Sequence, residues 1–593
     1  MTNKFLVSVI LISASVLAVV SVWNDSPIVD EIPHIGAGYS YVVKKDFRLN
    51  PEHPPLAKDL AGLALLTLNL KQSSFQTRFW TEDINGQWNF GRDLIFNSGN
   101  DAILLTRSAK LPMLLFFILS GLLIFHWAKK QAGRRAGLLA LFLFAFSPTV
   151  IAHSRFVTTD MPALFGVLVG TYFFLQFLKH KSNKGLWLAG LAFGIAQLTK
   201  FSAFLLIPYF IILAGVAAFY IHGDSPRGVA GKIKNLFKTI SGTIAIFAIG
   251  FIFIVWPLYG IHIVNYPPEK QKTDTIYHLG SYGNRAFADP IIWASDKPFI
   301  RPLAHYGTGL LMVNQRAIGG NTTYFLGEVR KNAWKHYFPI VYFIKEPLAF
   351  WGLVITVLIF ISTKFKIKNL KFKIIESSVK RNFTELSMLL WIAIYWYLSI
   401  RSNLNIGVRH LLPTYGFVFI LLAGQLNKLL EIVKAKKRVI RYSFVALLSV
   451  LFGWYLAENL KVFPYYITYF NQVAGGPKGG YIYVVDSNVD WGQDAKRLAK
   501  WVNANKISKI SLDYFGWADA GYYLGDKYVW INAGKYKNAS EFIADNPGGG
   551  YIAVSKSFYM GSREKEETSY AWLDSYKPIA DIGNSIFVWH ITP

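Results

Sequence analysis

Long apolar runs without charge alternate with shorter polar segments along this chain. A helix needs about 20 mostly apolar residues to cross a bilayer. Eleven runs approach that length: 5–24, 111–128, 136–154, 161–178, 185–199, 201–223, 239–268, 347–363, 386–400, 410–427 and 442–457. The pattern predicts a polytopic α-helical membrane protein with about 11 transmembrane helices. It excludes a soluble enzyme, a disordered chain and a nucleic-acid-binding protein.

Positive charge is concentrated in alternate segments between these runs. Five basic segments and Lys4 hold 25 of the 62 Lys and Arg residues, with four acidic residues in or beside them. The segments are 129–135, 179–184, 227–238, 364–381 and 428–441. Because basic loops stay cytoplasmic, we expect an integral protein of the plasma (cell) membrane, with its N-terminus in the cytoplasm and its C-terminus extracytoplasmic. The net charge of +27 then reflects topology and contact with membrane lipids, and nucleic acid is not an expected partner.

This topology divides the chain into a transmembrane domain, 1–458, and an extracytoplasmic region, 459–593. The transmembrane domain includes two outer loops, 25–107 and 261–338, and we expect its first apolar run to be retained as an anchor. In the C-terminal region, β-rich runs alternate with a helix-like run, which predicts a small α/β domain. The expected strands are Ile507–Tyr514, Tyr551–Ser555 and Ser585–Ile591, and the expected helix is Asp494–Ala504.

An acidic pair, Asp30 and Glu31, follows the first apolar run by a few residues, so it is predicted just above the outer membrane surface. The later stretch N50-P51-E52-H53-P54-P55-L56-A57-K58 contains a proline pair. Such a pair forces extended backbone and presents its flanking side chains rigidly. His53 and Lys58 can then be held near the acids. The alternative is a solvated acidic pair and a rigid loop that enters a surface helix.

A second acid, Asp160, ends the stretch H153-S154-R155-F156-V157-T158-T159-D160 in a short outer turn. Thr-Asp before Pro is a helix start signal, so a capping role is the alternative to a functional one. The basic residues predicted at the same level are Arg155, Lys200, Arg409 and His410. Each alone is typical of a side chain that reaches toward head groups. Together with two acids they suit a lipid-borne phosphate, which Arg binds bidentately and Lys binds as a point charge.

Three motifs together resemble a known family. They are V29-D30-E31-I32-P33-H34, H53-P54-P55-L56-A57-K58 and R155-F156-V157-T158-T159-D160. The sequence resembles the protein O-mannosyltransferase and lipid A aminoarabinose transferase group, which are polyprenyl-phosphate-sugar glycosyltransferases of the GT-C fold, family 39. The resemblance covers about the first 210 residues, and R409-H410-L411-L412-P413 is a weaker match. The C-terminal region does not resemble the MIR-type domain of the mannosyltransferases, and a lipid, a glycan and a protein all remain candidate acceptors.

The resemblance implies roles for individual residues. Asp30 matches the acidic position assigned as catalytic base, with Glu31 beside it, and Asp160 matches the second acidic position near the sugar. Lys58 and Arg155 match basic positions near the carrier phosphate. Ala57 stands where mannosyltransferases commonly have Gly, a small change.

These roles predict a membrane glycosyltransferase that takes a sugar from a polyprenyl monophosphate donor at the outer face. Asp30 would take the proton from an acceptor hydroxyl or amine as it attacks the anomeric carbon with inversion. Arg155, Lys200 and Arg409 would stabilise the charge on the leaving phosphate. His53, Lys58 and His410 complete the expected substrate-binding set. The scheme requires no cofactor or metal, and His53 or His305 would be the ligands if a divalent ion were bound.

Two other functions fit the same features. A transporter or flippase for a lipid-linked saccharide would share the apolar groove and the basic pocket, but it would need no acid at the position of a base. A ligase or polymerase that joins glycans would use a polyprenyl diphosphate donor instead. The chain has no cysteine, which excludes disulfides, thiolate metal sites and a cysteine nucleophile.

Two further features of the sequence can each be interpreted in more than one way. The stretch D486-S487-N488-V489-D490-W491-G492-Q493-D494 resembles the start of a calcium loop, with its glycine one position late. A capped turn and a sugar or acceptor contact are the alternatives. The aromatic residues Trp334, Tyr337 and Tyr342 suit carbohydrate stacking, although such residues are also enriched at membrane interfaces.

Overall fold

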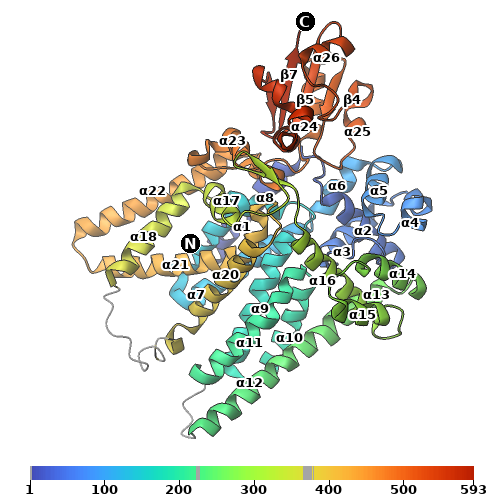
Figure 1. The fold of residues 1–593 in the computed structure, drawn as a ribbon. Coiled ribbons are helices and arrows are strands. Elements are labelled where there is room, and N and C mark those ends of the chain that lie inside the picture. The colour runs from blue at the N-terminus through green and yellow to red at the C-terminus, as the bar shows by residue number, and fades with distance from the viewer. Residues whose placement is uncertain (1–2, 222–227, 365–376, 378) are drawn as a thin grey trace.

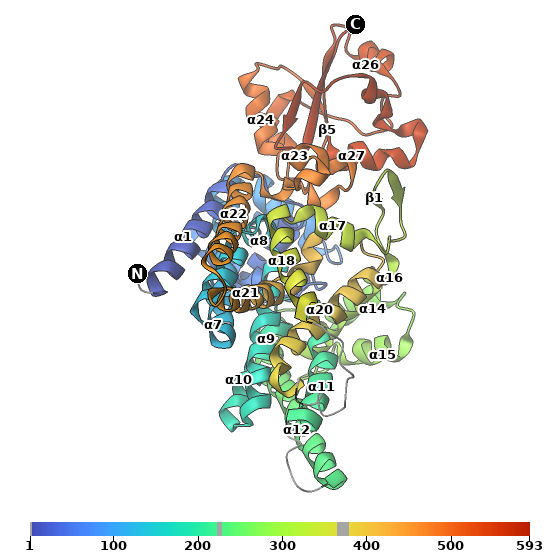
Figure 2. The ribbon, with the colours of Figure 1, turned by 90° about the vertical axis from the view of Figure 1, so that its left-hand side faces the viewer.

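The computed structural model describes residues 3–221, 228–364, 377 and 379–593, so most of the predicted basic segment 364–381, and residue 227 of another, lie outside the described residues. The apolar runs form a bundle of long helices (Figures 1 and 2). These helices are α1 (Asn3–Val22), α7 (Met113–Ala145), α9 (Asp160–His180), α10 (Asn183–Gln197), α11 (Leu206–Val216), α12 (Gly228–Gly250), α18 (Leu348–Lys364), α20 (Phe383–Arg401), α21 (Leu412–Lys434) and α22 (Arg438–Val462).

Eight helices in the described part of the chain are long and apolar enough to cross a membrane, or nine if α17 (Tyr337–Lys345) and α18 form one bent span. The prediction of about 11 counted two runs, 111–128 and 136–154, where α7 is interrupted at Gly133 with a φ of 87°, and the second run continues from α7 into α8 (Pro148–Ser154). It also counted the run that forms α10, whose 15 residues fall short of the length needed to span a bilayer. The polytopic helical class is confirmed.

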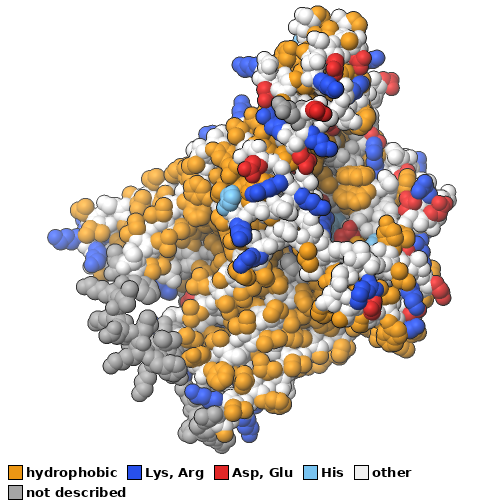
Figure 3. Space-filling model, in the orientation of Figure 1, with side chains coloured by type: hydrophobic (Ala, Val, Ile, Leu, Met, Phe, Trp, Pro, Cys, Tyr) orange, Lys and Arg blue, Asp and Glu red, His pale blue; other side chains and the backbone are white. Residues whose placement is uncertain are grey.

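On the face shown in Figure 3, hydrophobic side chains cover much of the helix bundle, whereas charged side chains are frequent on the C-terminal domain and the outer helices. Phe237 of α12, Leu358 of α18 and Val450 of α22 are all more than half exposed. Exposing so much apolar surface to water is unfavourable, and lipid tails remove that cost. The chain is therefore an integral membrane protein, while the orientation of its termini stays a prediction.

Short helices and one hairpin form the outer loops. They are α2 (Glu31–Lys44), α3 (Leu56–Leu65), α4 (Arg78–Thr81), α5 (Gln87–Arg92), α6 (Ala102–Lys110), α8 (Pro148–Ser154), α13 (Trp256–His262), α14 (Pro268–Leu279), α15 (Arg285–Ala294), α16 (Arg301–Gly319), β1 (Thr323–Phe325) and β2 (Glu328–Arg330). Two glycines let α2 and α3 pack at backbone contact: a Cβ on Gly38 would lie 2.1 Å from the Lys58 carbonyl oxygen, and one on Gly62 would lie 2.2 Å from that of Gly38. This packing fixes the loop before α3 against α2.

The C-terminal region contains a five-stranded mixed sheet in the order β4-β3-β5-β7-β6. Its elements are α23 (Gly476–Gly479), α24 (Ala495–Ala504), β3 (Ile510–Asp513), α25 (Ala520–Leu524), β4 (Tyr528–Trp530), α26 (Ala539–Asp545), β5 (Gly550–Ser555), α27 (Lys556–Gly561), β6 (Ala580–Ile582) and β7 (Ile586–Ile591). Alternation along β5 directs Ile552 and Val554 to one core and Ala553 to the other, where α24 packs with Leu498 and Val502. The predicted α/β domain is confirmed. The boundary at 458 stays a prediction, and α22 ends just beyond it.

Candidate functional site

A cavity of about 370 Å³ lies where the outer helices meet the ends of the membrane helices. Its polar lining includes Asp30, His34, Asn50, Glu52, His53, Lys200, Arg316, Arg409 and His410. Its apolar lining includes Phe201, Phe204, Leu205, Leu310, Val313 and Phe338. Five of the nine residues predicted from the sequence are therefore brought to one cavity, which combines charged groups with surface suited to a hydrocarbon chain.

Four charged side chains form one continuous network of ion pairs, and three of them line the cavity. Arg409 Nη1 lies 3.0 Å from Asp30 Oδ2 and 3.2 Å from Asp160 Oδ2. Lys200 Nζ lies 2.5 Å from Asp160 Oδ1. Asp30 precedes α2, Asp160 begins α9, Lys200 follows α10, and Arg409 precedes α21. Segments far apart in the sequence thus meet in a single cluster of two acids and two bases.

The two carboxylates of this network differ in their access to the cavity. The Asp30 side chain is 24% exposed, whereas that of Asp160 is 1% exposed. Asp160 is enclosed by Lys200 and Arg409, so both of its oxygens are already bonded to cations. Of these two carboxylates, Asp30 is therefore the one that a molecule in the cavity can contact, and Asp160 holds the two cations in place.

The C-terminal domain reaches into this network through the segment Asp486–Asp494. Arg409 Nε donates to Ser487 Oγ at 3.1 Å, and the guanidinium lies 4.2 Å from the centre of the Trp491 ring, a cation–π contact. The backbone N–H of Val408 donates to Asn488 Oδ1 at 3.0 Å. This positioning of Arg409 was not predicted from the sequence, because nothing local indicates which distant side chain the segment contacts.

Calcium binding by the same segment finds no support in the arrangement of its side chains. Asp490 accepts from the backbone of Gly492 and Ser557, and Asp494 is bonded to Arg497 and to Ser585 Oγ. Among the described residues, no group of three or more His, Asp and Glu side chains is placed to hold a metal ion.

Glu31 points away from the cavity. Its carboxylate accepts hydrogen bonds from the backbone of Ile28 at 3.0 Å and Val157 at 2.9 Å, and it forms an ion pair with Lys110 at 3.1 Å. Burial raises the pKa of Glu31, against the attraction of Lys110. Glu31 thus connects the start of α2 to the turn that contains Val157.

Lys58 is fully buried beneath the loop that carries His53. Its ammonium group donates to the Tyr41 hydroxyl at 2.9 Å, to the carbonyl and side-chain oxygens of Asn50, both at 2.8 Å, and to the carbonyl of His53 at 2.7 Å. Burial lowers the pKa of Lys58 to about 7. The resemblance implied a contact with the carrier phosphate, but the structure places Lys58 inside the loop as the donor that fixes its shape.

Arg155 also lies outside the cavity lining. Its guanidinium forms an ion pair with Asp25 at 2.9 Å and donates to Ser21 Oγ at 3.1 Å. Asp25 pairs in addition with Arg497 of α24 at 2.5 Å. This buried cluster fastens the C-terminal domain to the end of α1.

The two histidines considered as metal ligands lie in different surroundings. His53 lines the cavity and packs edge-on against His34 at 5.1 Å. Burial, with His34 and Lys58 nearby, lowers the pKa of His53 well below its usual value, so the ring is neutral. His305 packs among aromatic rings, 4.5 Å from that of Phe47, and burial lowers its pKa to about 3.

Several cavity residues were missed from the sequence. Asn50 and Glu52 belong to the motif that contains His53, and their place in it was the available signal. Arg316 comes from α16 in the second outer loop and has no motif that would have identified it. A basic side chain on an outer helix is ordinary unless the fold brings it to a cavity.

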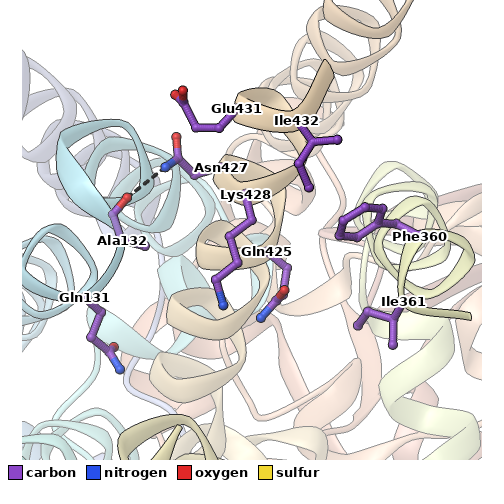
Figure 4. A pocket seen from close by; sticks show the side chains of 9 residues that line it. All are labelled: Gln131, Ala132, Phe360, Ile361, Gln425, Asn427, Lys428, Glu431 and Ile432. Atoms are coloured by element: carbon purple, nitrogen blue, oxygen red, sulfur yellow. Dashed lines mark hydrogen bonds between the residues drawn. The ribbon is translucent and has the colours of Figure 1, made fainter. Parts of the chain in front are cut away.

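Another hollow, of about 600 Å³, lies between α7, α18 and α21 and is lined by residues such as Gln131, Ile361 and Lys428 (Figure 4). Asn427 closes one side by donating to the carbonyl of Ala132 at 2.8 Å. None of the predicted site residues lines this hollow.

Comparisons with known proteins find similarity to part of the sequence and to the fold. The family model described as dolichyl-phosphate-mannose-protein mannosyltransferase matches residues 104–256. Dolichyl-phosphate-mannose–protein mannosyltransferases 1 and 5 of Saccharomyces cerevisiae are 24% identical over 267 residues and 25% identical over 205 residues. These alignments cover 43% and 31% of this chain and 29% and 27% of the yeast proteins. The chain therefore aligns with less than a third of each relative's length.

One solved structure supports the same fold. The S. cerevisiae Pmt1–Pmt2 complex bound to the sugar donor matches with a TM-score of 0.53 at 12% identity, over 78% of this chain and 90% of that one. ArnT from Cupriavidus metallidurans bound to undecaprenyl phosphate has a TM-score of 0.46 at 11% identity, over 100% and 99% of the two chains. The predicted GT-C fold and the resemblance to this group are confirmed.

Proposed function

We propose that this chain is a membrane glycosyltransferase that moves a sugar from a polyprenyl monophosphate to an acceptor on the outer face. The observation that carries the proposal is the accessible carboxylate of Asp30, bonded to Arg409 at a cavity with apolar walls. The family match and the donor-bound yeast structure support the class of donor. The isoprenoid tail would lie against the apolar lining, with the phosphate near Lys200 and Arg409.

The proposed step is a direct displacement. The acceptor oxygen forms a bond to the anomeric carbon while the bond from that carbon to the phosphate oxygen breaks. Asp30 takes the acceptor proton, and the polyprenyl phosphate leaves with the electron pair, so the anomeric centre is inverted. Lys200 and Arg409 stabilise the charge that grows on the phosphate, and Asp160 keeps both of them oriented.

The substitution Asp30→Asn tests the base. It keeps the size of the side chain but removes its ability to accept a proton, so we expect a kcat roughly 10²–10⁴-fold lower, with expression intact. Asp289→Asn is a matched control, because Asp289 is exposed on α15 and outside the cavity. Transfer at the wild-type rate by Asp30→Asn would remove Asp30 as the base.

The donor class is tested in the same assay. Detergent-purified protein is supplied in parallel with labelled polyprenyl monophosphate sugars and polyprenyl diphosphate sugars, and products are separated from the carrier lipid. We expect transfer only from monophosphates. Transfer only from diphosphates would identify a glycan ligase, whereas movement of intact lipid-linked saccharide across vesicles without product would identify a flippase.

A further inference from the structure

A groove of about 450 Å³ lies on the outer surface next to the cavity, with three aromatic side chains from three separate parts of the chain. Trp88 comes from α5 in the first outer loop, Tyr277 from α14 in the second, and Trp517 from the C-terminal domain. In Figure 1, α25, α5 and α14 follow one another down the same side of the molecule. The groove is therefore built jointly by both outer loops and the C-terminal domain.

The aromatic rings of this groove are open to solvent and held in place. The rings of Trp88 and Trp517 contact one another across the domain boundary, with centroids 5.0 Å apart. Trp517 is 38% exposed and Tyr277 is 68% exposed. An ion pair of 3.0 Å between Arg92 and Asp519 joins α5 to the C-terminal domain beside this contact. A cluster of large exposed rings on a fixed framework is a candidate binding surface, unlike rings that are exposed singly.

The aromatic residues that were predicted to stack on carbohydrate cannot do so. Trp334, Tyr337 and Tyr342 are 4%, 0% and 7% exposed, so their ring faces are already covered. An interfacial aromatic belt does not account for Trp517 either, because the C-terminal domain stands away from the apolar surface of the helix bundle (Figures 1 and 3).

The remaining lining of the groove includes three polar side chains, Asp83, Asn85 and Asn89, together with Ile84 and Gly86. Aromatic faces carry partial negative charge and attract the C–H groups of a sugar ring, while amides and carboxylates bond its hydroxyls. Asn85 connects this lining to the cavity, because its side-chain amide donates to Glu52 at 3.4 Å. Trp88 lines both the groove and the cavity.

We propose that this groove binds a saccharide acceptor and directs one of its hydroxyls to Asp30. The proposal rests on the proposed glycosyltransferase function and specifies its acceptor as a glycan or glycolipid. An acceptor bound against Trp517 and Tyr277 would pass Trp88 to enter the cavity, where the exposed carboxylate of Asp30 faces it. The C-terminal domain thereby contributes to acceptor recognition as well as to the position of Arg409.

Direct binding tests the groove without any transfer. The full chain in detergent is titrated with labelled oligosaccharides of about two to six hexose units, without donor, and the change in tryptophan fluorescence or ligand anisotropy gives the Kd. We expect Trp517→Ala to weaken binding about fivefold to tenfold, as for the loss of one aromatic contact. Tyr277→Ala should weaken it to a similar or smaller degree. Trp530→Ala is the matched control, because Trp530 is a 64%-exposed tryptophan of the same domain outside the groove.

The outcomes separate this inference from the proposed function. Saccharide binding that is weakened by Trp517→Ala or Tyr277→Ala but not by Trp530→Ala supports the groove. Absence of binding by any oligosaccharide overturns it, as does binding unaffected by both groove variants, or preferential binding of Ser- and Thr-containing peptides that Trp517→Ala weakens. Asp30→Asn should still bind saccharide, so a failure of Asp30 as the base leaves this result intact. In turnover assays, Trp517→Ala should raise the KM for acceptor with the KM for donor unchanged.

Discussion

Replacing Ser487 by Ala tests whether the C-terminal domain positions the arginine of the site. Ser487 is 2% exposed, accepts from Arg409 Nε at 3.1 Å and donates to the carbonyl of Ile406 at 2.5 Å. A hydrogen bond to a charged group contributes about 1.5–3 kcal/mol. Because about 1.36 kcal/mol corresponds to a tenfold change in rate, we expect a kcat about 10- to 100-fold lower if Arg409 must be held while charge grows on the phosphate. The KM for donor should change less, because Lys200 and the contact of Arg409 with Asp160 remain.

The assay is the initial rate of label transfer from a polyprenyl monophosphate sugar, with thermal unfolding measured on the same preparations. Ser557→Ala is the matched control: Ser557 Oγ accepts from the backbone of Asp486 at 3.1 Å and forms no contact with Arg409. Ser487→Thr keeps a hydroxyl and should recover part of the rate. A wild-type kcat for a stably folded Ser487→Ala variant would refute the idea that this segment positions Arg409.

Two further predictions concern the loop and helix pair that frame the cavity. Lys58→Met should lower the free energy of unfolding by about 1–3 kcal/mol, because it removes the donor shared by Tyr41, Asn50 and His53 and leaves their buried oxygens without it. Burial lowers the pKa of Lys58 from 10.5 to about 7, so between those values the unfolded chain binds the extra proton. The stability of the wild type relative to Lys58→Met should therefore rise with pH across that window, and a fall measured by scanning fluorimetry would contradict the assignment. Gly38→Ala should prevent folding or lower the melting temperature strongly, because its Cβ would meet the Lys58 carbonyl at 2.1 Å, whereas Gly215→Ala, with nothing within 4 Å, should be nearly neutral.

The membrane fold could be predicted from the sequence because apolar run length is a direct physical requirement of the bilayer. The strands of the C-terminal domain followed for a similar reason, since β5 and β7 read as short β-rich runs between turns. The number of full-length spans is harder to predict from the sequence. An apolar run that stops at a break such as Gly133, or that forms a short helix such as α10, has the same composition as a run that crosses the bilayer.

The site could be predicted in part. Asp30, Lys200 and Arg409 were expected at one membrane level, and the structure brings them to one cavity. Membrane level does not fix the direction in which a side chain points. Lys58 and Arg155 were expected near the phosphate, but each is directed to buried oxygen acceptors in its own surroundings. Which acceptors lie within reach is decided by tertiary packing.

The charges of the site suggest how the donor would prepare the base in the proposed reaction. Asp30, Arg409, Asp160 and Lys200 form a chain of alternating charge that is balanced without substrate. Arg316 also lines the cavity, but the two cations of this network, Arg409 and Lys200, are already paired with carboxylates that a phosphate would have to displace to bind them. Asp160 cannot leave, because its departure would strand two cations in a buried site. Asp30 is partly exposed and can turn toward water, so the phosphate would replace it at Arg409. The carboxylate then becomes free to accept a proton only when the donor is bound, which links activation of the acceptor to the presence of the sugar.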